Sequence, residues 1–203
     1  MSSKIGIFGG TFDPIHIGHL IIASEICEKL ELDEIRFVVA PRPPHKNGIV
    51  ASDDDRVTMV LRAIERDRRF RIDLREFDRP GRSYTVDTIQ SFHDEFPTSQ
   101  LVFIMGEDSL LDFPSWNDPE IIVDLATIAV ASRPKVDLDL SLLFERLPAA
   151  RDRIIEVKTP EVAISSTLIR ERLAKGESIR YLVPAEVETA IYDRSLYHET
   201  VVR

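Results

Sequence analysis

Near its N-terminus the chain carries an apolar strand pattern that leads directly into two glycines, a turn and two histidines. The sequence from Lys4 reads KIGIFGGTFDPIHIGH, in which IGIF predicts a buried strand. Gly9-Gly10 predicts a turn that lets a ligand approach the backbone closely. A helix that starts soon afterwards offers unpaired N–H groups and the positive end of its dipole. His16 and His19 would share one face of its first turn, so the segment predicts a polyphosphate site.

Apolar strand patterns and amphipathic helix patterns alternate along the rest of the sequence. Strands are expected at residues 4–8, 34–40, 70–74, 101–105, 127–131 and 154–157. Helices are expected at residues 17–30, 52–64, 84–96, 167–175 and 184–192. Residues 136–153 match no clear pattern.

This alternation favours an α/β fold, a Rossmann-like doubly wound parallel sheet with helices on both faces. We expect a single domain over residues 1–203, in which about 160–203 form a small C-terminal helical part. In such sheets ligands bind beyond the carboxyl ends of the strands. The segments expected there are GGTFDPIHIGH, PRPPHK, GEDSL and SRPK, which hold most of the distinctive chemistry of the chain.

The composition limits the classes of partner. A formal net charge of −9 argues against general affinity for nucleic acid or an anionic membrane surface. The single cysteine, Cys27, cannot form a disulfide framework, which fits a reducing cytosol and a cytoplasmic protein. No apolar run approaches the roughly 18 residues of a membrane span, and we expect no secretory signal. The sequence leaves open whether the chain forms a homo-oligomer.

The two common phosphate-binding loops do not match. A dinucleotide fingerprint needs GxGxxG, whereas the glycines here are spaced GxxGG, and no GxxxxGK[ST] motif occurs. A second candidate anion site lies at residues 164–170, ISSTLIR. Ser165 and Ser166 predict a helix start with free N–H groups, and Arg170 follows about one turn later. A guanidinium can bind two phosphate oxygens at once.

The HxGH and ISSTLIR motifs together resemble those of the nucleotidyltransferase superfamily, in which HxGH binds the phosphates of a nucleoside triphosphate. Within it, the chain is similar to bacterial nicotinate mononucleotide adenylyltransferases over nearly its whole length. The similarity rests on GGTFDPIHIGHL, PPHK at 43–46, SYTVDT at 83–88, GEDSL at 106–110, Trp116, and VPxxV at 183–187. Residues 136–153 match no motif of the family.

The resemblance implies two sets of binding residues. Those expected to contact ATP are Gly9, Gly10, Thr11, Phe12, His16, His19, Gly106, Asp108, Ser165, Ser166, Thr167 and Arg170. Those expected to contact the mononucleotide are Lys46, Tyr84, Thr85, Trp116 and Arg133, with Trp116 against the nicotinate ring. Trp116 could instead fill a gap in the core, but its place between Pro114 and Pro119 favours a loop.

The implied reaction transfers the adenylyl group of ATP to nicotinate mononucleotide and yields deamido-NAD and pyrophosphate without a covalent enzyme intermediate. The attacking 5′-phosphate has a second pKa near 6 and needs no catalytic base. The expected catalytic residues are the cations His16, His19, Lys46 and Arg170. We expect His19 and Arg170 to act on the triphosphate, and His16 and Lys46 near the α-phosphate. No protein-built metal site is expected, because Mg²⁺ would be carried by ATP.

Two alternatives remain open. Pantetheine-phosphate adenylyltransferases share the superfamily motifs, but they are usually shorter and lack the SYTVDT and Trp116 pattern. A nucleotide-binding sensor without turnover would keep the glycines and the serine-capped helix but lose a cation, and all four cations are present. A preference for the acid over the amide mononucleotide rests on the resemblance alone.

Overall fold

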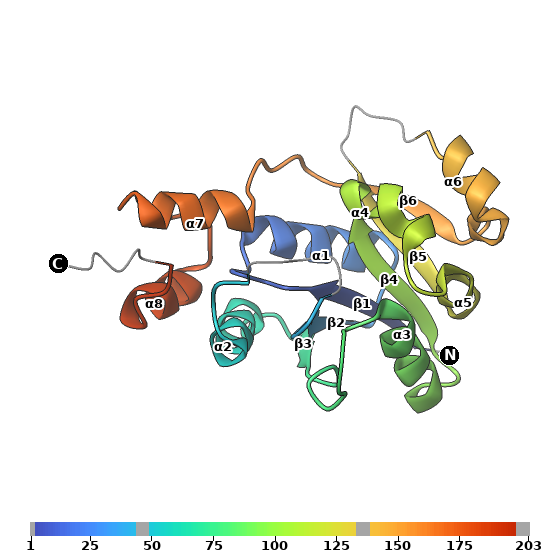
Figure 1. The fold of residues 1–203 in the computed structure, drawn as a ribbon, viewed down its shortest axis with the longest axis horizontal. Coiled ribbons are helices and arrows are strands. Elements are labelled where there is room, and N and C mark those ends of the chain that lie inside the picture. The colour runs from blue at the N-terminus through green and yellow to red at the C-terminus, as the bar shows by residue number, and fades with distance from the viewer. Residues whose placement is uncertain (1–2, 44–48, 133–138, 198–203) are drawn as a thin grey trace.

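The computed structural model of the chain describes residues 3–43, 49–132 and 139–197. Six parallel strands form one sheet in the order β3-β2-β1-β4-β5-β6 (Figure 1). The strands are β1 (Lys4–Gly10), β2 (Glu34–Val39), β3 (Phe70–Asp73), β4 (Gln100–Gly106), β5 (Ala126–Ser132) and β6 (Ile154–Lys158). The strand order reverses between β1 and β4, which is the place where doubly wound sheets bind ligands. The α/β prediction is confirmed.

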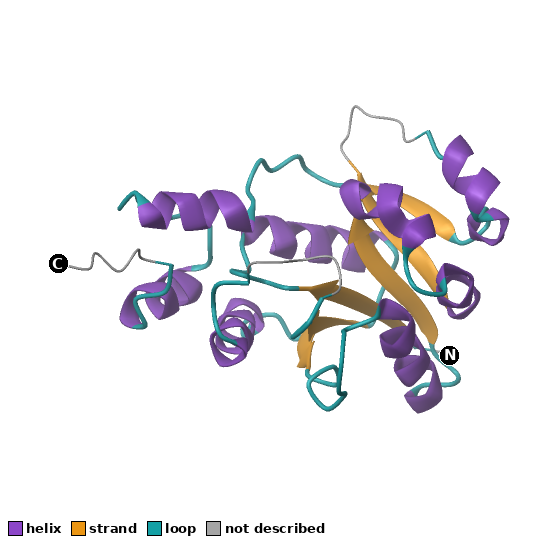
Figure 2. Ribbon diagram, viewed as in Figure 1, coloured by secondary structure: helices purple, strands orange, loops and turns teal. Residues whose placement is uncertain are grey.

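The helices cover both faces of the sheet (Figure 2). They are α1 (Ile17–Lys29), α2 (Asp53–Ile64), α3 (Thr85–Glu95), α4 (Glu107–Asp112), α5 (Pro119–Leu125), α6 (Ser141–Arg146), α7 (Ser166–Ala174) and α8 (Ala185–Asp193). The longer helices, α1, α2, α3, α7 and α8, lie where the sequence predicts them. The short helices α4, α5 and α6 were not predicted, because one or two turns give too little periodicity to detect.

Alternating side chains of the strands divide the core into two layers. Ile5 and Ile7 of β1 point into the layer shared with α3 and α5, whereas Phe8 points into the layer shared with α1 and α2. The second of these layers also takes in Ile169 of α7 and Val187 of α8. The C-terminal helices therefore pack beside α1 and α2 as an extension of the same core (Figure 1).

The first strand runs further than expected. Gly9 and Gly10 were predicted to form a turn, but both belong to β1, where Gly10 pairs with Val39 of β2. The chain turns instead at Phe12, whose φ is 50°, and at the cis peptide bond between Asp13 and Pro14. A Cβ on Gly10 would lie 2.8 Å from the Phe12 ring, so glycine is needed there for close approach.

A fully buried arginine connects the ends of β1 and β2. Arg56 of α2 has 0% exposure, and its Nη1 donates to the carbonyls of Thr11 at 2.7 Å and Ala40 at 2.9 Å. Its Nη2 pairs with Asp53 in the first turn of the same helix. These bonds compensate the buried charge through Nη1 and Nη2, while Nε has no hydrogen-bond partner in the described part of the chain, and they hold the segments after the two strands together. No helix in the described part of the chain is long and apolar enough to cross a membrane.

Candidate active site

The two histidines of the HxGH motif stack at the start of α1. His16 is the residue before the first helical turn, and His19 lies within that turn. Their ring centroids are 3.7 Å apart, and the His16 backbone N–H donates to His19 Nδ1 at 3.2 Å. Because Nδ1 accepts this bond, the neutral His19 ring carries its proton on Nε2. Phe8 and Phe12 make edge-to-face contacts with the His19 ring and so help to fix its orientation.

The second predicted motif lies against the first. Ser165 caps α7 by accepting the Leu168 N–H at 3.1 Å, as the sequence predicts. The Ser166 hydroxyl donates to the Pro14 carbonyl at 2.9 Å, and Arg170 Nη1 donates to the Asp13 carbonyl at 2.6 Å. The start of α7 is thereby fastened to the turn that precedes the histidines.

The two motifs line one cleft of about 550 Å³, which we call the phosphate cleft. Its lining residues are Thr11, Asp13, His16, His19, Ile49, Asp108, Ile164, Ser165, Ser166, Thr167 and Arg170. His16, His19 and Arg170, which are distant in sequence, therefore line the same cavity. The cleft combines two imidazoles, a guanidinium and a helix N-terminus, which is a donor set suited to several phosphate groups.

Asp13 is a buried carboxylate in this cleft, and the sequence did not single it out. It is 4% exposed, and its oxygens accept the backbone N–H groups of Val50 at 2.9 Å and Ala51 at 3.1 Å. The Tyr197 hydroxyl donates to Oδ1 at 2.7 Å. An anion beside an expected phosphate site has to be well satisfied, and this one is held by three donors.

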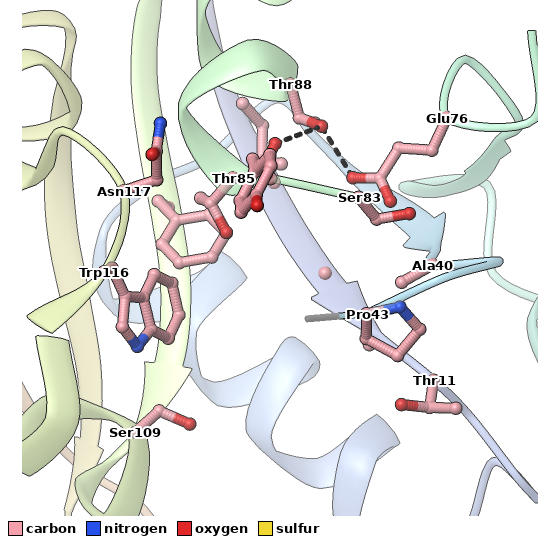
Figure 3. Close-up of a pocket in the computed structure, with 15 residues that line it drawn as sticks. Thr11, Ala40, Pro43, Glu76, Ser83, Thr85, Thr88, Ser109, Trp116 and Asn117 are labelled. Atoms are coloured by element: carbon pink, nitrogen blue, oxygen red, sulfur yellow. Dashed lines mark hydrogen bonds between the residues drawn. The ribbon is translucent and has the colours of Figure 1, made fainter. Parts of the chain in front are cut away.

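A second cavity of about 210 Å³, the Trp116 cavity, adjoins the phosphate cleft. Figure 3 shows Trp116, Ser109 and Asn117 on one side of it and Glu76, Ser83 and Thr88 on the other. Tyr84 and Thr85 also line it, and so do Gly9 and Gly10, which were expected to contact ATP. Thr11 lines both cavities, so it marks the point where they meet.

The indole of Trp116 packs at the rim of the core. Its ring lies edge-on to Phe103 at 6.1 Å and to Phe113 at 5.5 Å, between the short helical turn Phe113–Ser115 and α5. The loop position predicted for Trp116 is confirmed. A flat aromatic surface in a cavity offers a stacking partner for a planar ring.

Glu76 is a second buried carboxylate that sequence reasoning missed, and it lines the Trp116 cavity. It is 7% exposed, and the Thr88 hydroxyl donates to its Oε1 at 2.6 Å. Burial raises the pKa of Glu76, although Thr88, Ser83 and Arg79 each favour the charged form. Nothing in the LREFD sequence around Glu76 distinguishes it from an exposed acid, because its burial comes from α3 packing over it.

Replacing Glu76 with glutamine is expected to raise the melting temperature at pH 7–8. A carboxyl whose pKa is raised by folding stabilises the fold fully below its unfolded pKa of about 4.3 and loses that stability as the pH rises through the raised value. Neutral glutamine avoids this loss, and a gain of roughly 1 kcal/mol corresponds to about 2–4 °C.

Thermal melts from pH 4 to pH 8 test this expectation, and the advantage of the variant should shrink toward zero at pH 4. Glu95→Gln is the control, because Glu95 is exposed and pairs with Arg75. It should give no gain at any pH. A Glu76→Gln protein that melts below the wild type at pH 8 would contradict the expected cost of burial.

A third cavity of about 300 Å³ lies at the C-terminal ends of β4 and β5. It shares His16, Asp108 and Ile164 with the phosphate cleft and adds Ala131 and Ser132 of β5. The segments after β1, β2 and β4 and the C-terminal end of β5 therefore border a group of neighbouring cavities, as expected for a parallel sheet.

Two predicted site residues line none of these cavities, and two others lie outside the described residues. The Phe12 side chain is buried in the core beneath His19 instead of lining a cavity. Gly106 is the N-cap of α4, two residues before the lining residue Asp108, and lines none of the three cavities. Lys46 and Arg133 fall outside the described residues. Within the described ranges no cluster of three or more His, Cys, Asp or Glu side chains could hold a metal ion.

Comparisons with a family model and with curated relatives place the chain in a single family. A family model described as cytidylyltransferase-like matches residues 7–172, which include both motifs. A Thermomicrobium roseum protein named "Probable nicotinate-nucleotide adenylyltransferase" is 45% identical, over 96% of this chain and 92% of that protein. A Thermus thermophilus protein of the same name is 44% identical, over 96% and 99%. The chain belongs to the nicotinate-nucleotide adenylyltransferase family.

The fold of this adenylyltransferase family also appears among solved structures. Plasmodium falciparum nicotinic acid mononucleotide adenylyltransferase complexed with NaAD matches with a TM-score of 0.78 at 22% identity. The match covers 96% of this chain and 97% of that one. A Vibrio parahaemolyticus structure described as "a Putative Nicotinate-nucleotide Adenylyltransferase" matches with a TM-score of 0.71 at 18% identity, over 98% of this chain and 97% of that one. At these identities the likeness concerns the fold.

Proposed function

We propose that the chain transfers the adenylyl group of ATP to nicotinate mononucleotide, forming deamido-NAD and releasing pyrophosphate. The activity named for the relatives at 44–45% identity supports this proposal. The observation that carries it is the junction at Thr11, where a cleft with two imidazoles and a guanidinium meets a cavity with a flat indole. With the triphosphate of ATP in the cleft and the pyridine ring of the mononucleotide against the indole, the phosphates of the two substrates would lie together at this junction.

The proposed chemistry is a direct displacement. An oxygen of the mononucleotide 5′-phosphate forms a bond to the α-phosphorus of ATP, while the bond from that phosphorus to the β-phosphate oxygen breaks. The attacking phosphate is largely ionised at neutral pH, because its second pKa is near 6. The work of the protein is therefore to hold two anions in contact and to stabilise the charge of the departing pyrophosphate.

The side chains of the phosphate cleft supply the donors for this work. His19 and Arg170 are proposed to act on the triphosphate and His16 near the α-phosphate, and Lys46 remains a proposed partner of His16. Arg133 remains a proposed contact of the mononucleotide. Mg²⁺, carried by ATP, would supply additional neutralisation of the phosphate charge.

A pyrophosphate-release assay tests the function. The protein is incubated with ATP and Mg²⁺ plus nicotinate mononucleotide, nicotinamide mononucleotide or phosphopantetheine in parallel reactions. We expect release with nicotinate mononucleotide and none with phosphopantetheine. Release with phosphopantetheine alone would overturn the proposal. Tight ATP binding in calorimetry with no release from any acceptor would indicate a sensor.

Replacing Trp116 with alanine is expected to raise the KM for the mononucleotide by about tenfold, with less than a twofold change in the KM for ATP. In the proposed arrangement the indole stacks on the pyridine ring and not on adenine, and losing such a contact costs roughly 0.5–1.5 kcal/mol in addition to the lost apolar area. Steady-state kinetics with each substrate varied in turn measure the split. Trp116→Phe keeps an aromatic face and should recover much of the affinity. Equal increases in both KM values would argue against stacking.

A further inference from the structure

The chain returns to the HxGH turn after its last helix. Residues Arg194 to Tyr197 follow α8, and Ser195 and Tyr197 both adopt left-handed backbone conformations, with φ of 51° and 64°. Residues with a Cβ rarely adopt such conformations, and they tend to persist where the surrounding structure enforces them. Here they bring the Tyr197 ring against the core and its hydroxyl to Asp13, 184 residues earlier in the chain.

The Tyr197 hydroxyl differs from the other donors to Asp13 because it belongs to a side chain. The Val50 and Ala51 bonds come from the backbone, so in the described part of the chain Tyr197 supplies the one side-chain hydrogen bond to this carboxylate. Burial and the neighbouring carboxylate raise the pKa of Tyr197, so its hydroxyl remains a protonated donor at neutral pH.

Arg170 lies beside the same carboxylate without forming a close ion pair with it. Its Nη1 is 3.9 Å from Asp13 Oδ2, whereas a charge-assisted hydrogen bond would be about 2.7–2.9 Å long. The guanidinium instead donates a hydrogen bond to the Asp13 carbonyl and lines the phosphate cleft. A carboxylate that lacked one of its donors would compete for this guanidinium.

We propose that Tyr197 is a positioning residue of the ATP site: by satisfying the Asp13 carboxylate, its hydroxyl keeps Arg170 directed at the triphosphate. This inference rests on the proposed function, because it takes the phosphate cleft to be the place where ATP binds. Tyr197 acts through Asp13 and Arg170 and lines none of the described cavities. A segment at the far end of the sequence thereby completes a site that begins at residue 11.

Tyr197→Phe removes the hydroxyl and keeps the ring. We expect the KM for ATP to rise about tenfold, the scale of one hydrogen bond to a charged group, while the KM for the mononucleotide changes less than twofold. Tyr181→Phe is the matched control, because Tyr181 is 81% exposed and lies outside the cavities. It should match the wild type. In an Arg170→Ala background, Tyr197→Phe should add little, since both changes act on one contact.

The shift in melting temperature caused by ATP with Mg²⁺ gives a second readout that needs no turnover. We expect a smaller shift for Tyr197→Phe than for Tyr181→Phe, and a destabilised variant still reports this difference. Equal shifts, equal rises in both KM values, or an undiminished effect without Arg170 would overturn the inference. If the wild type binds ATP but releases no pyrophosphate, the proposed function fails, while the melting comparison still tests Tyr197.

Discussion

Replacing His19 with alanine is expected to lower kcat for adenylyl transfer by about 10²–10³, the usual cost of losing one donor that stabilises developing charge. The His19 ring lies in the phosphate cleft, and its Nδ1 is engaged by the His16 backbone, which leaves Nε2–H as the donor. The melting temperature should fall by only a few degrees, because the ring contributes edge contacts with Phe8 and Phe12, stacking on His16 and a single hydrogen bond from the His16 backbone. Stopped assays of pyrophosphate release with saturating substrates measure the effect.

His93→Ala is the matched control for this prediction. His93 lies in the last turn of α3 and borders a different cavity, together with Lys4 and Arg153. Its replacement should leave kcat within about twofold of the wild type. A His19→Ala protein that unfolds, or that keeps full activity, would show that the imidazole has a structural role.

Replacing Arg170 with alanine is expected to lower kcat/KM for ATP by about 10²-fold or more. The guanidinium can bind two phosphate oxygens at once, and its loss removes the one cation that α7 places in the phosphate cleft among the described residues. Arg170→Lys should recover only part of the loss, because an ammonium cannot reproduce the two-pronged geometry. Kinetics with ATP varied at saturating mononucleotide give the measurement.

The same helix provides the control, because Arg172 follows two residues later and faces away from the cleft. Arg172 donates to the Ser178 carbonyl at 2.8 Å and pairs with Glu177 at 3.1 Å. An exposed pair of this kind is worth about 1 kcal/mol at most, so Arg172→Ala should change stability slightly and kinetics not at all. Similar kinetic losses in both variants would mean that the helix, and not the guanidinium, is what matters.

Much of the fold could be predicted from local patterns. Continuous apolar strands and well-capped helices identified all six strands and the five longer helices, because periodicity and capping are short-range properties. The short helices α4 to α6 depend on packing against the sheet, which a sequence window does not contain. The predicted turn at Gly9-Gly10 was wrong, because pairing with β2 extends the strand and shifts the reversal to Phe12.

The site shows the same division between short-range and long-range information. The HxGH and ISSTLIR motifs gave the donors of the phosphate cleft, because each motif is contiguous. Asp13, Glu76 and Tyr197 could not be singled out, since their importance comes from burial and from partners far away in the sequence. Asp13 lies inside the recognised motif, but the neighbouring sequence does not indicate that it would contact both Arg170 of α7 and Tyr197 of the C-terminal segment.

The buried guanidinium of Arg56 ties the carbonyl of Thr11, which lines both compartments, to that of Ala40, which lines the Trp116 cavity. Neither carbonyl can move far without breaking its hydrogen bond to Arg56, and water cannot replace that bond because the guanidinium is fully buried. Because Thr11 lines both cavities, any displacement of it by a ligand in one cavity also changes the wall of the other. By thermodynamic reciprocity, whatever factor ATP applies to the affinity for the mononucleotide, the mononucleotide applies equally to the affinity for ATP.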